Sequence, residues 1–148
     1  MKHDLSQMEL RGRTRVWWPG LAVWGPVVAY AGVIFWLSAQ THPEEQVPSL
    51  FDLFGDKILH AVEYAGLGAL CCRGFRWALP GAPLSRALFL GLVAASLYGI
   101  TDEVHQLFVP FREAGWQDWL ADTAGAAVGS AVAARLPGLC LFLPPRQR

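Results

Sequence analysis

Residues 17–37 read WWPGLAVWGPVVAYAGVIFWL and contain no charged side chain. A helix that crosses the hydrocarbon core of a bilayer needs roughly 20 mostly apolar residues, so this stretch is long enough to span a membrane. Arg11, Arg13 and Arg15 precede it, as basic residues precede the apolar core of a signal peptide. No small-residue cleavage site follows the stretch, so we expect an uncleaved first transmembrane helix.

Three further apolar runs follow, at residues 58–72, 87–108 and 119–136. Proline and glycine end helices, and they separate these runs at residues 42–48, 80–83, 110–115 and 137–138. The run 58–72 is short and the run 119–136 is weakly hydrophobic, so both need neighbouring helices to shield their polar groups. The pattern predicts an all-α, polytopic membrane protein, a bundle of about four transmembrane helices.

The composition agrees with a membrane protein. Hydrophobic residues make up 53% of the chain and charged residues only 16%, against about 25% charged in typical soluble domains. Basic and acidic residues balance at 12 each, whereas a nucleic-acid-binding protein normally has a basic surplus. We therefore expect the lipid bilayer, and no nucleic acid, as a partner. Cys71, Cys72 and Cys140 match no zinc or redox spacing and are interpreted as small apolar residues.

Basic residues predict how the helices are oriented. Four lie in the N-terminal segment, three in the loop after the second run and three at the C-terminal end. Only Lys57 and Arg112 lie on the other side, and basic residues favour the cytoplasmic side. The expected organisation is a cytoplasmic tail (1–16), a four-helix transmembrane domain (17–136) and a cytoplasmic tail (137–148), in the inner (plasma) membrane.

Polar residues recur at helical spacing where the second and third runs approach the outer side. On the second, Asp56, His60 and Glu63 fall on one face, with Tyr64 beside them. On the third, three residues share a face with Gln106 on its flank, while Glu103 is expected to point away; the three are Tyr98, Asp102 and His105.

The fourth run carries its own polar and small-residue stripe, with Asp118, Asp122, Gly125 and Gly129 in line. The two glycines form a GxxxG motif, which indicates close helix packing. We expect this contact to lie within one bundle and to bring the two aspartates toward the other polar faces.

Charged groups at membrane depth are costly unless they are paired or hydrated, so we expect the three polar faces to meet around one cavity near the outer surface. The candidate ligand-binding residues are Asp56, Lys57, His60, Glu63, Tyr64, Asp102, Glu103, His105, Gln106, Arg112, Asp118 and Asp122. The alternative is an ion-paired cluster that only fixes the register of the helices. The sequence does not identify a cofactor or the oligomeric state. It leaves metal binding open.

These motifs, in this order, resemble the VanZ-like family over about residues 35–129. The resemblance is carried by Phe35-Trp36-Leu37-Ser38-Ala39-Gln40, by Asp56-Lys57-Ile58-Leu59-His60 with Tyr64, Leu67 and Gly68, and by the stretch from Asp102 to Pro110 with Arg112, Asp118, Gly125 and Gly129. Phe111 departs from the family pattern, which usually has glycine before the arginine. The resemblance implies a four-helix bacterial membrane protein, and the family's namesake is linked to glycopeptide resistance, teicoplanin in particular.

Three functions remain open at this point. The first is an envelope-associated protein whose outer pocket binds the headgroup of a lipid or cell-wall precursor, with Lys57 and Arg112 as the cations that would meet phosphate. The second is a membrane hydrolase or transferase acting on a lipid-linked substrate, with His60 or His105 as general base, or with a metal held by histidine and aspartate. The third is a small transporter subunit. Whether the chain is an enzyme stays open.

Overall fold

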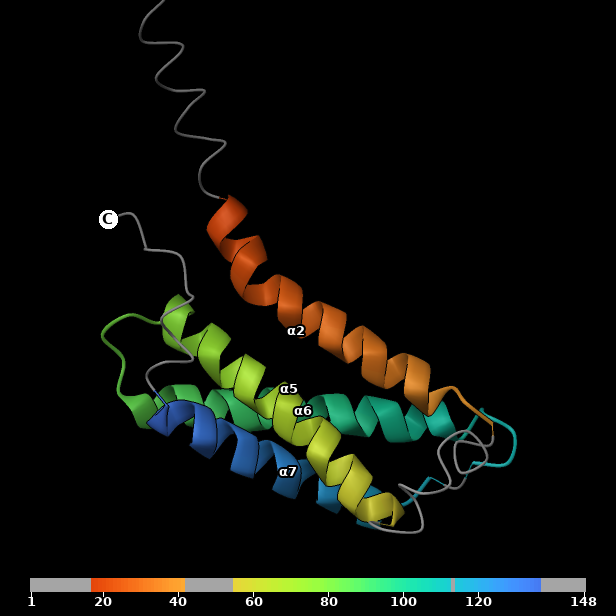
Figure 1. The fold of residues 1–148 in the computed structure, drawn as a ribbon. Coiled ribbons are helices and arrows are strands. Elements are labelled where there is room, and N and C mark those ends of the chain that lie inside the picture. Colours follow the sequence, from red (N-terminus) through yellow and green to blue (C-terminus); the bar gives the residue numbers. More distant parts are fainter. Residues whose placement is uncertain (1–16, 42–54, 113, 137–148) are drawn as a thin grey trace, which may run out of the picture.

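The computed structural model describes residues 17–41, 55–112 and 114–136. Four helices make up nearly all of this part, namely α2 (Trp17–Ser38), α5 (Asp56–Ala78), α6 (Leu84–Gln106) and α7 (Trp116–Arg135), and it contains no strand (Figure 1). The predicted all-α class is confirmed for these residues. The expected tails 1–16 and 137–148 lie outside the described residues, as does the loop 42–54.

The helices do not begin and end at the same residues as the apolar runs. The second run, expected at 58–72, is part of a helix that extends from Asp56 to Ala78 and includes Arg73 and Arg76. An apolar run marks only the middle of such a helix, because basic side chains are favourable near a helix C-terminus. Gly81, with a φ of 83°, then turns the chain between α5 and α6.

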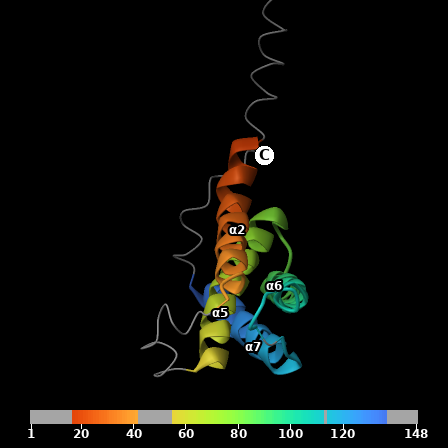
Figure 2. The ribbon, with the colours of Figure 1, turned by 90° about the vertical axis from the view of Figure 1, so that its right-hand side faces the viewer.

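The three later helices form the packed part of the molecule. α5 packs along α7 and α6, and α2 lies over α5 and α6 on the side away from α7 (Figures 1 and 2). Since α5, α6 and α7 alternate in direction, the start of α5, the end of α6 and the start of α7 share one end of the bundle. The polar positions noted in the sequence belong to these three helix ends.

Small residues allow α5 and α7 to approach closely. A Cβ atom on Gly125 would overlap the backbone carbonyl oxygen of Ala61, and one on Gly129 would overlap that of Ala65. The Ser130 hydroxyl donates a hydrogen bond of 3.0 Å to the Gly68 carbonyl in the same interface. Gly125 and Gly129 therefore lie where two helix backbones meet inside one chain.

Large apolar side chains face outward on all four helices. Val28, Phe89, Val62 and Val128 are each at least 60% exposed, and they come from four different helices. By length and composition, two helices are apolar enough to cross a membrane, over Gly20–Ser38 and Leu84–Gln106.

Candidate functional site

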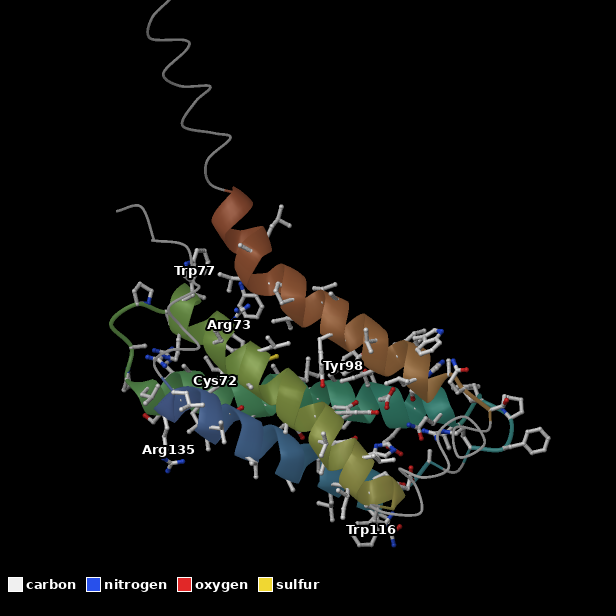
Figure 3. The ribbon with its side chains drawn as sticks, viewed as in Figure 1. Cys72, Arg73, Trp77, Tyr98, Trp116 and Arg135 are labelled. Atoms are coloured by element: carbon white, nitrogen blue, oxygen red, sulfur yellow. The ribbon has the colours of Figure 1, made fainter. Side chains whose placement is uncertain are left out.

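The described charged residues are divided between the two ends of the bundle. Arg73 and Arg135 lie at one end and Trp116 at the other (Figure 3). The end that carries Trp116, at the start of α7, also carries all six described carboxylates, which are Asp56, Glu63, Asp102, Glu103, Asp118 and Asp122. Among the described residues, its only lysine and arginine are Lys57 and Arg112. This end therefore has an excess of acidic groups.

A buried pair joins α5 to α7 at the centre of this end. The Nδ1 atom of His60 lies 3.0 Å from Oδ1 of Asp122. Asp122 is fully buried and His60 is 6% exposed. The other ring nitrogen, Nε2, lies 3.8 Å from a carboxylate oxygen of Asp56, one helical turn away. The imidazole is thus held between two carboxylates, one buried and one near the surface.

Glu103, which was expected to point away from the face of Tyr98, Asp102 and His105, belongs to this centre. One oxygen each from Glu103 and Asp122 and one nitrogen of His60 all lie within 4.8 Å of one another. Oε2 of Glu103 accepts a 2.8 Å hydrogen bond from the Gly115 N–H. Because α6 packs against both α5 and α7, side chains outside the face of Tyr98, Asp102 and His105 are also enclosed.

A second polar group links α6 to α2. The amide nitrogen of Gln106 donates to the Asp102 carboxylate at 3.2 Å and to the Ser38 hydroxyl at 3.0 Å, and all three side chains are buried. Ser38 was not among the candidate residues. It could have been found, since it lies in the motif Phe35–Gln40 that carries the family resemblance.

His105 does not face the central pair. Its ring stacks on Phe35 of α2, with centroids 4.2 Å apart. On the same side of α6, the Tyr98 hydroxyl donates a 2.7 Å hydrogen bond to the Ala31 carbonyl. The expected face of Tyr98, Asp102 and His105 is thus mainly a contact with α2, because α2 covers the side of α6 away from α7.

The remaining candidates surround the centre at different depths. Tyr64 is fully buried and Glu63 half-buried. At the edge, the Lys57 ammonium lies 2.6 Å from an oxygen of Asp118, so it pairs inside the protein. No ion pair joins Arg112 to Asp102 or Glu103 within residues 55–112.

An apolar groove of about 300 Å³ opens beside this centre, between the end of α6 and the start of α7. Its lining is Ile100, Glu103, Val104, Leu107, Ala114, Gly115, Trp116 and Trp119. Of the candidate site residues, Glu103 alone contributes to this lining. The polar centre and this apolar groove thus lie side by side, with Glu103 belonging to both.

Comparison with known proteins gives a family. A family model described as VanZ/LLP1 matches residues 12–139. No curated protein and no solved structure matches the chain. The match spans most of the chain, including all four helices and the whole polar end.

Proposed function

Because the chain belongs to the VanZ/LLP1 family, we propose that it is a multi-pass protein of the bacterial inner membrane whose polar end binds the headgroup of an envelope lipid or a lipid-linked cell-wall precursor. The polar end would face the extracytoplasmic side. The hydrocarbon chain of the ligand would lie in the apolar groove between α6 and α7. An involvement in teicoplanin or other glycopeptide resistance would follow from binding such a precursor.

The surface of the molecule supports the membrane part of this proposal. Apolar side chains exposed on all four helices suit contact with lipid, whereas soluble monomers seldom expose such continuous apolar area. α5 and α7 are less apolar than the other two helices, and they make the most extensive helix contact with each other. Their buried polar side chains, among them His60, Asp122 and Ser130, therefore face the protein interior and not lipid.

The proposed orientation can be tested with reporter fusions. Arg73, Arg76, Arg86 and Arg135 belong to the end that would be cytoplasmic, since basic residues favour that side. A reporter that is active only in the periplasm should work when fused after Pro48 or Gly115 and fail after Pro80. Activity after Pro80 would reverse the orientation and put the polar end in the cytoplasm.

The proposal that the protein binds an amphiphile rests on the groove between α6 and α7. It is lined by apolar side chains, and the Glu103 carboxylate, which belongs to the polar centre, stands at its edge. An amphiphile fits this arrangement, because its chain would cover apolar surface while its headgroup meets polar groups. Arg112, half-buried at the same end of α6, is the basic residue best placed for a phosphate oxygen.

Filling the groove should weaken binding without touching the polar centre. Val104 lines the groove and is 50% exposed, so Val104→Trp adds bulk there. Displacing two methylene groups of a bound chain would cost about 1.6 kcal/mol, roughly a 15-fold loss of affinity. The measurement is photo-crosslinking of the purified, reconstituted protein with a radiolabelled polyprenyl phosphate.

The matched control is Val128→Trp, which adds the same side chain at an exposed position of α7 outside the groove. It should crosslink like the unaltered protein. Equal crosslinking of both variants would remove the groove from the proposal.

A second function is favoured by one observation. A histidine hydrogen-bonded to a buried carboxylate is a common arrangement for a general base, and His60 and Asp122 form such a pair 3.0 Å apart. A hydrolase or transferase acting on the bound headgroup would use the same centre. Release of inorganic phosphate or of a headgroup from the reconstituted lipid, abolished in a His60→Gln variant that folds like the unaltered chain, would establish it.

A further inference from the structure

We propose that His60, Glu103 and Asp122 hold a divalent transition-metal ion of the Mn²⁺ type at the extracytoplasmic end of the bundle. The three residues come from α5, α6 and α7, so the ion would join the three packed helices. The site deepens the proposed headgroup function, because a bound cation supplies the positive charge that a phosphate needs. Metal binding itself requires no lipid.

The geometry suits a small cation. One donor atom from each residue lies within 4.8 Å of the other two, and the His60–Asp122 distance is 3.0 Å. Around an ion with bonds of about 2.1 Å, neighbouring donor atoms are roughly 3.0–3.4 Å apart. The His60–Asp122 pair is thus already at a chelating distance, and a Glu103 oxygen lies within 4.8 Å of both.

Unpartnered oxygens point to a missing donor or cation. Oδ1 of Asp122 is bonded to His60, whereas Oδ2 of this fully buried side chain has no hydrogen-bond partner among the described residues. Glu103 shows the same division, with one oxygen bonded to Gly115 and the other, Oε1, unpartnered. Buried carboxylate oxygens are normally satisfied, so these two require an explanation. A cation bound to the imidazole nitrogen, in place of its proton, would be shared by both carboxylates.

Gly99 keeps space open beside this centre. A Cβ atom at that position would lie 3.1 Å from Oδ2 of Asp122 and 3.3 Å from the ring of Tyr64. The unpartnered oxygen therefore faces a position at which a larger residue would crowd it.

The balance of charge favours a cation as well. Six carboxylates share this end with Lys57 and Arg112 among the described residues, and Lys57 is already paired with Asp118. Like charges held close together in a low-dielectric setting repel strongly, and a divalent ion at the centre removes most of that repulsion.

The donor set indicates which ions to expect. Carboxylates alone would suit Mg²⁺ or Ca²⁺, whereas an imidazole nitrogen favours first-row transition metals. One imidazole with two carboxylates suits Mn²⁺, which accepts both donor types. Asp56, 3.8 Å from the far ring nitrogen, would help to orient the imidazole.

The experiment uses the full, tag-free chain in detergent with no added lipid and titrates it with Mn²⁺ alone, followed by electron paramagnetic resonance. We expect one Mn²⁺ per chain, with a nitrogen signal from one imidazole in electron spin-echo spectra. Glu103→Gln keeps an oxygen for the Gly115 N–H but loses the charge, and it should weaken Mn²⁺ binding at least tenfold. His105→Gln, which alters the histidine that stacks on Phe35, should bind Mn²⁺ as the unaltered chain does.

Three results would overturn the site. They are the absence of stoichiometric Mn²⁺, bound Mn²⁺ without a nitrogen signal, and undiminished binding by a Glu103→Gln variant whose circular dichroism matches the unaltered chain. The nitrogen signal is read on the unaltered chain, so it decides the matter even if the variant does not fold. Because no lipid is present, a negative result leaves the headgroup proposal to be tested by the groove variants.

Discussion

Replacing His60 by leucine is expected to reduce the amount of folded protein in the membrane sharply. The substitution leaves the Asp122 carboxylate fully buried without its 3.0 Å partner. Removing one member of a buried charged pair typically costs about 3–5 kcal/mol, because the other charge stays desolvated. Membrane abundance and the melting temperature of the purified protein in detergent would measure this loss.

A double variant separates folding from function. Replacing a buried pair by apolar residues of similar volume is often neutral for stability, so His60→Leu with Asp122→Leu should recover most of the abundance. We expect this double variant to fold and still to lose lipid crosslinking and Mn²⁺ binding. A double variant that folds and keeps both activities would show that the pair serves only to fix helix register.

Gly129→Leu is expected to have the other large effect. A Cβ atom at this position already overlaps the Ala65 carbonyl oxygen of α5, so a leucine must push two helix backbones apart. Overpacking in a close contact costs about 1–3 kcal/mol where side chains can shift, and backbone atoms cannot shift in that way. We expect poor expression and a melting temperature in detergent well below that of the unaltered chain.

The matched control is Val128→Leu, one residue earlier on α7, where the side chain is 61% exposed. It places the same leucine side chain on the outer face and should melt like the unaltered chain. Equal melting temperatures for the two variants would contradict the close contact between α5 and α7.

Much of the fold could be predicted from the sequence, because proline and glycine end a helix at their own position in the chain. Pro83 and Gly81 separate α5 from α6, and Pro137 follows the end of α7, as the sequence indicates. The length of the second helix was underestimated. An apolar run stops before basic residues such as Arg73, although these belong to the last turns of the helix.

The site was less predictable. Helical periodicity indicates which residues share one face of a helix, but not which other helix that face contacts. His105 was expected at the polar centre but lies against α2, since the position of α2 decides which part of α6 faces that centre. The His105 ring stacks on Phe35. Glu103 accepts a hydrogen bond from the Gly115 N–H, immediately before α7. Such contacts between distant segments are not encoded in the spacing within one helix.

Native mass spectrometry of the intact chain, released from bacterial membranes in mild detergent, would show whether the protein binds a lipid headgroup. We expect one phosphate-containing amphiphile per chain, retained by Val128→Trp and lost from Val104→Trp and from the His60→Leu, Asp122→Leu double variant. A chain that carries no such amphiphile, or one whose amphiphile is unaffected by these substitutions, would contradict the proposal.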